Sequence, residues 1–237
     1  MMPPEEKGKM MINNKKLEKV FVIIIYSVLF YAAWAVFELL LSDNMLSFTD
    51  NGVVREVMRS GVVKNLIWTV PALLLVRKYD SDMMIGLKEM FSSKVNVVSF
   101  LPVFIIIAAY VLFASFRANE GIYISDSFGA ADIITVLFVG ITEESVFRGW
   151  LLNSTLKNCD SKPKVCAAVL INAVMFLIIH FPIWIHNGVF EANLGSTAFL
   201  TIIILSCLFS WCFIKSKNIF VPIVVHMFYD LLIFMFI

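Results

Sequence analysis

Long apolar segments alternate with short polar stretches along this chain of 237 residues, and they constrain its fold more than any other feature. A transmembrane helix needs about 20 mostly apolar residues, with a range of roughly 17–25. Seven segments meet this requirement: approximately residues 20–41, 60–76, 96–116, 131–153, 165–182, 197–214 and 219–236. Only 16% of the residues are charged, whereas soluble domains carry about 25%. We therefore expect an all-α fold, a polytopic transmembrane helical bundle with about seven membrane helices.

The remaining segments complete the expected organisation. Residues 42–59 are polar with scattered apolar positions and could form an interfacial helix, which leaves an eighth membrane helix possible. The first apolar segment is too long for a signal peptide and lacks a cleavage site, so we expect it to be retained. We divide the chain into a polar N-terminal tail (1–18), N-terminal transmembrane helices (19–125) and a C-terminal helical core (126–237).

The basic residues predict the orientation in the membrane. With seven helices and the N-terminus inside, 15 of the 19 lysines and arginines fall on the inner side. The four on the outer side are Arg55, Arg59, Lys64 and Arg117. Cytoplasmic loops carry such an excess of basic residues. We expect a plasma-membrane protein with a cytoplasmic N-terminus. A net charge of +1 gives no basic field for a nucleic-acid partner.

The fourth apolar segment contains three charges near its middle, Glu143, Glu144 and Arg148. A charge at the bilayer centre costs at least about 2.5–3.5 kcal/mol, so such residues normally face the bundle interior and have a function. Glu144 and Arg148 are four residues apart and are predicted to pair on one helix face. Glu143 is turned about 100° away and is predicted to remain available as a general base.

Two of the three histidines also lie inside apolar segments. His180 ends the fifth segment, and His226 shares a helix face with Asp230 in the seventh. A single histidine in a membrane helix usually forms a hydrogen bond between helices, but all these polar groups together on three helices are harder to explain by packing. Glu38 and Asp132 lie near segment ends and are expected at the rim.

Three motifs occur in order, Glu143-Glu144-x-x-x-Arg148, Phe176-x-x-x-His180 and His226-x-x-x-Asp230. Together they resemble the CPBP family of CAAX proteases and bacteriocin-processing enzymes, also called the Abi family. The resemblance covers about residues 130–237 and identifies the C-terminal core as catalytic. It implies an intramembrane endopeptidase that processes a CAAX-type substrate, or a leader- or pheromone-type precursor.

The resemblance also implies a role for each motif. Glu143 would activate water with His180, Arg148 would orient Glu144, and His226 with Asp230 would hold the oxyanion. Many family members have Asn in place of Asp230, and an Asp has to be protonated to donate a hydrogen bond. The expected substrate is a peptide or a membrane-anchored protein, in contact with the lipid bilayer.

Several alternatives remain open at this point. Glu143, His180 and His226 could instead hold a divalent metal such as Zn²⁺, although we favour a mechanism that requires no cofactor. The chain contains no H-E-x-x-H or G-x-S-x-G motif of other intramembrane proteases. A proton-coupled transporter could use the same groups, but the chain has no internal repeat. A non-catalytic bacteriocin self-immunity protein is the third possibility.

Overall fold

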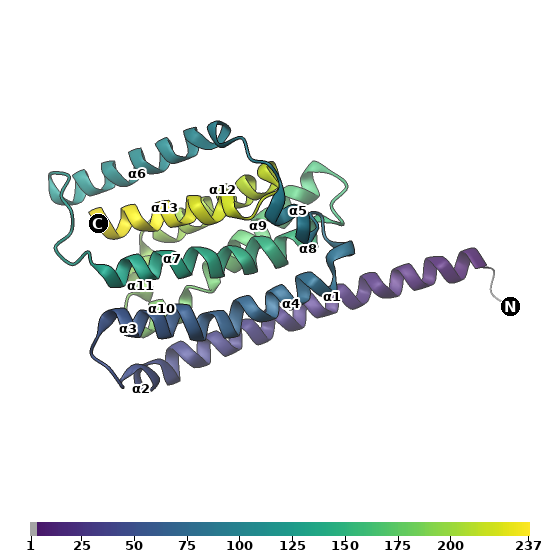
Figure 1. The fold of residues 1–237 in the computed structure, drawn as a ribbon, viewed down its shortest axis with the longest axis horizontal. Coiled ribbons are helices and arrows are strands. Elements are labelled where there is room, and N and C mark those ends of the chain that lie inside the picture. The colour runs from purple at the N-terminus through teal and green to yellow at the C-terminus, as the bar shows by residue number, and fades with distance from the viewer. Residues whose placement is uncertain (1–3) are drawn as a thin grey trace.

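The computed structural model describes residues 4–237, and the side chains from Leu17 onward. The described chain is helical throughout and contains no strand, which confirms the predicted all-α class. The long helices run roughly parallel or antiparallel to one another, side by side (Figure 1).

The first two predicted membrane helices are longer than the apolar segments that predicted them. The first consists of α1 (Pro4–Val36), η1 (Phe37–Leu41) and α2 (Ser42–Leu46). The second consists of α3 (Gly52–Glu56), η2 (Val57–Val63), η3 (Asn65–Thr69) and α4 (Val70–Lys78). The expected interfacial helix at 42–59 is therefore wrong, because its residues end one helix and begin the next. Asn51 separates them by capping α3, accepting a hydrogen bond from the Val54 N–H at 3.2 Å.

The third, fourth and fifth predicted helices follow after a short polar connection. That connection contains η4 (Asp80–Asp82) and α5 (Leu87–Ser92). The third helix consists of η5 (Val97–Phe100) and α6 (Leu101–Asn119). The fourth consists of α7 (Ala130–Glu144), η6 (Ser145–Leu152) and α8 (Asn153–Leu156). The fifth consists of α9 (Lys162–Ile178), a turn, and α10 (Phe181–His186).

The last two helices, α12 (Ala198–Ser216) and α13 (Phe220–Phe236), follow the short α11 (Phe190–Gly195). A helix therefore stands at each of the seven predicted places. Five of these helices are long and apolar enough to cross a membrane: Leu17–Leu46, Gly52–Lys78, Val97–Asn119, Lys162–His186 and Ala198–Ser216. The helix from Ala130 to Leu156 is not among them, and α13 has only 17 residues. The count of seven or eight spans stays a prediction.

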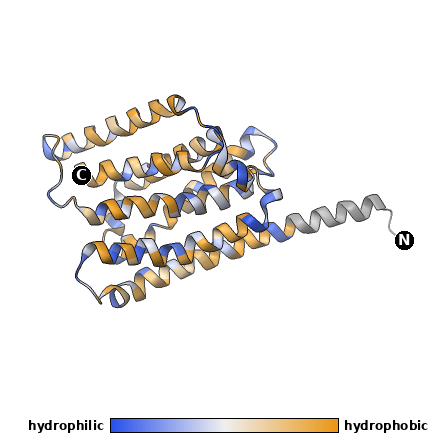
Figure 2. Cartoon of the chain, in the orientation of Figure 1, coloured by the Kyte–Doolittle hydropathy of each residue, from blue (hydrophilic) through white to orange (hydrophobic). Residues whose placement is uncertain are grey.

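Apolar residues predominate along the helices, and hydrophilic residues gather mainly in the connections at both ends (Figure 2). Large side chains such as Ile105, Phe113 and Leu170 are exposed on the sides of the bundle. Lipid favours such a surface, because it offers apolar contacts and no hydrogen-bond partners. The chain is a multi-pass membrane protein.

The interior of the bundle is packed with aromatic rings. Trp68 lies edge-on to Phe30 and Trp34, with ring centroids 4.7 and 4.9 Å apart. Asn153 fixes the connection after α4 to the fourth helix, because its side chain accepts from the N–H of Ile85 at 2.9 Å and donates to the carbonyl of Ile85 at 2.8 Å. This buried pair of hydrogen bonds closes the bundle at that end.

The two ends of the bundle differ in charge. One end, here called the lysine-rich end, contains α5, α8 and the turn between α12 and α13 (Figure 1). Backbone contacts join these segments, for example from the Ile219 N–H to the Met90 carbonyl at 2.9 Å. The other end, here called the opposite end, contains the α2–α3 turn, the start of α7 and the C-terminus (Figure 1). It is joined by contacts such as His186 to Asp43 at 3.4 Å.

Candidate active site

Glu143, in the last turn of α7, is buried and pairs with a lysine that the sequence analysis did not select. Lys64 Nζ donates to Glu143 Oε1 at 2.7 Å, and both side chains are at most 7% exposed. The Lys64 ammonium also lies 4.3 Å from the ring centre of Trp68 and 5.5 Å from that of Trp34. The expectation of an unpaired Glu143 is therefore wrong, because α7 packs against the second helix at the level of Lys64. The second carboxylate oxygen, Oε2, has no hydrogen-bond partner among the described residues.

The predicted pair of Glu144 and Arg148 is confirmed. Arg148 Nη1 donates to Glu144 Oε1 at 3.0 Å, and both side chains are fully buried. Arg148 Nη2 donates to the carbonyl of Ser206 at 2.8 Å and to its hydroxyl at 2.6 Å. The guanidinium also lies over the ring of Phe176, 4.7 Å from its centre. This pair therefore fixes the fourth helix to α9 and α12.

His226, on α13, joins the two glutamates to Asp230. Its Nδ1 lies 2.8 Å from Glu144 Oε1, the oxygen that also accepts from Arg148. Its Nε2 lies 3.4 Å from Asp230 Oδ2 and 3.9 Å from Glu143 Oε2. An ionised carboxylate only accepts hydrogen bonds, so Nδ1 carries the proton that is donated to Glu144. The other ring nitrogen is thereby directed to Asp230 and Glu143.

His180 lies in the turn between α9 and α10, and this turn brings it to the site. The chain leaves the helix after Ile178, and Pro182 follows in the first turn of α10. His180 Nδ1 lies 2.7 Å from the carbonyl of Phe176, so it donates there and leaves Nε2 available. Reading 165–182 as one continuous helix predicts His180 about one turn away in depth from Glu143. In the structure, His180 and Glu143 nevertheless line the same cavity.

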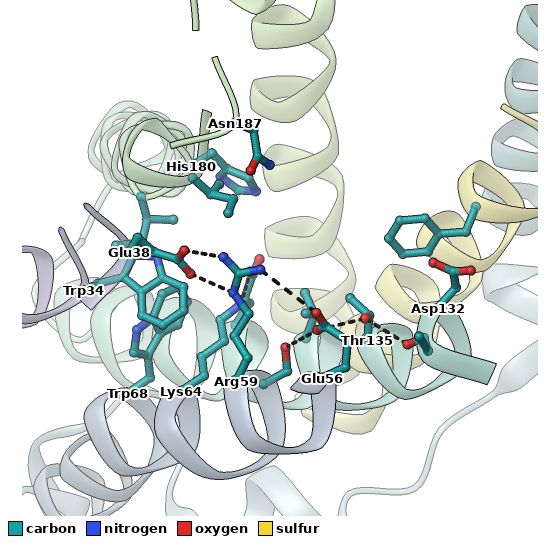
Figure 3. Close-up of a pocket in the computed structure, with 17 residues that line it drawn as sticks. Trp34, Glu38, Glu56, Arg59, Lys64, Trp68, Asp132, Thr135, His180 and Asn187 are labelled. Carbon is teal, nitrogen blue, oxygen red and sulfur yellow. Dashed lines mark hydrogen bonds and ion pairs between the residues drawn. The ribbon is translucent and has the colours of Figure 1, made fainter. Parts of the chain in front are cut away.

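That cavity has a volume of about 400 Å³ and contains a chain of polar contacts (Figure 3). Arg59 donates to both carboxylate oxygens of Glu38, and its Nε lies 3.2 Å from Glu38 Oε1. Arg59 also approaches Glu56 at 4.0 Å, and the Thr135 hydroxyl donates to Glu56 at 3.1 Å. Glu38 was expected at the rim but is 1% exposed, because Arg59 pairs with it inside the bundle.

Charged residues of the first, second and fourth helices lie in or beside stretches with wider turns. The segments η1, η2, η3 and η6 are π-helical, and they contain Glu38, Arg59 and Arg148, with Lys64 between two of them. Such turns are rare and often occur at functional sites. They also change which residues share a face, so sequence spacing alone could not place Lys64 opposite Glu143.

The polar groups do not form a metal-ligand set. Among the described residues, no group of three or more His, Cys, Asp or Glu side chains is arranged to hold a metal ion. The cation next to Glu143 is the ammonium of Lys64. In this arrangement Glu143, His180 and His226 do not fit the tetrahedral set of protein ligands that Zn²⁺ prefers.

All six residues selected from the sequence lie in this region of the bundle. Glu144, Arg148, His226 and Asp230 form a connected set, and His226 extends it to Glu143. The sequence analysis missed Lys64, Arg59 and Ser206. The position of Lys64 inside the second apolar segment could have indicated a buried role, but the count of basic residues on each side of the membrane assigned it to the outer side.

Comparison with known proteins finds one family match, in the C-terminal part of the chain. Residues 126–232 match the family described as type II CAAX prenyl endopeptidase Rce1-like. No curated protein and no solved structure matches the chain at a significant level. The matched region contains all six selected residues and excludes the first three membrane helices. The resemblance to the CPBP family is thereby confirmed for residues 126–232, which match an Rce1-like domain.

Proposed function

We propose that this protein is an intramembrane endopeptidase in which Glu143 activates the water that attacks a peptide carbonyl. The observation that supports this most is the state of the Glu143 carboxylate: Lys64 holds Oε1, while Oε2 has no hydrogen-bond partner among the described residues. Glu143 also lines the cavity. The ammonium favours the ionised carboxylate, and the second oxygen can accept a proton from water.

In this proposal the histidines position the reacting groups. His180 donates through Nδ1 to Phe176, so its Nε2 can accept a hydrogen bond from the attacking water. His226 is oriented by its bond to Glu144, so its Nε2 can share a proton with Asp230, 3.4 Å away. Whichever of the two carries that proton can donate it to the oxyanion. Glu144 and Arg148 act as positioning residues.

The proposed reaction is hydrolysis of a peptide bond. Water gives one proton to Glu143, and its oxygen forms a bond to the carbonyl carbon. His226 and Asp230 stabilise the negative charge on the carbonyl oxygen of the tetrahedral intermediate. The carbon–nitrogen bond then breaks, and Glu143 returns its proton to the leaving amine. One water is consumed, and its second proton passes from the new carboxyl group to the amine, so the products are a carboxylate and an ammonium group.

We propose that no metal takes part, because the Lys64 ammonium supplies the positive charge beside Glu143. A Zn²⁺ held by Glu143, His180 and His226 would have to displace that ammonium and rearrange the hydrogen bonds of both histidines. The two mechanisms differ in their response to chelators, because only a metal-dependent enzyme would lose activity.

Comparative peptidomics tests the proposed function. Cells that produce the wild-type protein are expected to contain a processed peptide that is missing from cells with Glu143→Gln. Glu191→Gln is a matched control, since Glu191 is exposed on α11 away from the cavity, and it should process normally. Peptide profiles that are identical for wild type and Glu143→Gln, with equal amounts of folded protein, would favour the non-catalytic self-immunity alternative.

A further inference from the structure

The cavity that leads to Glu143 lies in one half of the bundle. Its lining begins at the opposite end with Ala131, Asp132 and Asn187 and reaches inward to Glu143 and His180. Glu143 is the fourteenth residue of α7, which places it about 20 Å along the helix from Ala130 at 1.5 Å per residue. The path from the opposite end to the site therefore has the length of half a membrane.

The other half of the bundle is closed beyond the site. After Glu144 the fourth helix continues with eight consecutive buried residues, Ser145–Leu152. Trp150 is fully buried, with its ring 6.2 Å from Tyr26 and 5.9 Å from Tyr79. The hydrogen bonds between Asn153 and Ile85 lie beneath this layer. Among the residues with described side chains, from Leu17 onward, none of the lysine-rich end lines the cavity, so the cavity opens toward the opposite end.

Basic residues mark the closed side. Of the 15 lysines and arginines with described side chains, ten lie at the lysine-rich end: Lys19, Arg77, Lys78, Lys88, Lys94, Lys157, Lys162, Lys164, Lys215 and Lys217. Three, Arg55, Arg59 and Arg117, lie in the opposite half, and the remaining two are inside the bundle. Membrane proteins keep such basic loops in the cytoplasm. The closed half therefore faces the cytoplasm, and the cavity faces the other side of the membrane.

We infer that the substrate reaches Glu143 from the non-cytoplasmic side, so the scissile bond belongs to an exported or outward-facing polypeptide. This inference rests on the proposed function and specifies its substrate class. A prenylated cysteine attached to the cytoplasmic leaflet would have to pass the closed layer around Trp150. A leader, a propeptide or an outward-facing segment of an anchored protein reaches the cavity directly from the opposite end.

Cysteine accessibility tests the direction of access without requiring cleavage. The four native cysteines are first replaced, and single cysteines are then introduced as Asn187→Cys at the cavity mouth, Ser60→Cys in its wall and Asn158→Cys at the lysine-rich end. Full-length variants are treated in intact cells of a bacterial host with a small membrane-impermeant maleimide. We expect at least about tenfold more labelling of Asn187→Cys and Ser60→Cys than of Asn158→Cys, and labelling of Asn158→Cys only after the membrane is opened.

Two results would overturn the inference. If Ser60→Cys is labelled only under conditions that also label Asn158→Cys, the path to Glu143 lies in the closed half. Labelling of Asn158→Cys in intact cells, with Asn187→Cys protected, would place the cavity in the cytoplasm. Thr135→Cys, also in the wall, replaces Ser60→Cys if that variant does not fold. A protein that labels as expected but processes no peptide would contradict the proposed function and leave the direction of access standing.

Discussion

Lys64→Met tests whether the ammonium of Lys64 is the counterion of Glu143. The substitution keeps a long apolar side chain against Trp34 and Trp68 but removes the charge 2.7 Å from Glu143 Oε1. Both side chains are at most 7% exposed, so solvent screens their interaction only weakly. Removing one partner of a buried ion pair costs about 3–5 kcal/mol, because the other charge stays buried. We expect a loss of unfolding free energy of about this size, measured by denaturant titration in detergent micelles.

The chain provides a matched control for the loss of the ring contact. Lys215 is exposed and lies over Trp211 and Phe100, 4.5 and 5.4 Å from the ring centres. Lys215→Met removes a comparable cation–ring contact without leaving a buried anion, and exposed contacts of this kind contribute about 0.5–1 kcal/mol. Its effect should stay in that range.

The double variant Lys64→Met/Glu143→Gln separates the pair from its surroundings. It removes both charges, so we expect it to recover most of the stability that Lys64→Met loses, and to be inactive. Equal stability of Lys64→Met and Lys215→Met would refute the assignment of a buried pair. The assignment would also be refuted if the losses of unfolding free energy from the two single substitutions simply add in the double variant, since the effects of substituting interacting residues are not additive.

Three further substitutions probe other contacts. Glu144→Gln leaves Arg148 without its anion and should lower the unfolding free energy by about 3–5 kcal/mol in the same titration. The control Glu89→Gln removes an exposed partner of Lys217 and should cost under about 1 kcal/mol, so equal losses would contradict the buried pair. Asp230→Asn should keep most of the cleavage rate, and chelators should leave the cleavage rate unchanged, whereas loss of an anionic metal ligand or its partner would lower it about 10–100-fold. A stoichiometric metal together with a severe defect of Asp230→Asn would favour the Zn²⁺ mechanism. Asn153→Ala removes both hydrogen bonds to Ile85 and should speed proteolysis of the 79–96 connection at the lysine-rich end, with Asn158→Ala as the exposed control. Proteolysis at an unchanged rate would show that other contacts fix this connection.

The sequence predicted the helical class and the places of seven helices, and the six residues it selected lie in one region of the bundle. Hydrophobic length identifies membrane helices well, because lipid leaves few alternatives for the backbone. Charges inside those segments then indicate the site, and the spacing of Glu144 and Arg148 predicted their contact. Contacts between side chains on separate helices could not be predicted from the sequence in this way.

The missed contacts have specific physical causes. Lys64 meets Glu143 because two helices pack at one depth, and the π-helical turns η2 and η3 on both sides of Lys64 shift the faces that a regular helix would present. A short turn at Ile179 and His180 joins α9 to α10, where the sequence suggested one continuous helix. The start of α3 at Gly52 likewise depends on a single cap, Asn51, inside a segment without clear periodicity.

The pairing of charges between helices also has a consequence for biosynthesis. Glu38, Arg59 and Lys64 each stand inside a helix that is long and apolar enough to cross the bilayer, and each alone would cost at least about 2.5–3.5 kcal/mol at the bilayer centre. Glu38 is matched by Arg59 on the next helix, so the first two helices can leave the insertion machinery as a neutralised hairpin. Lys64 has no such match until the fourth helix is synthesised 79 residues later. The second helix would therefore have to stay near the machinery, or near an assisting chaperone, until Glu143 emerges.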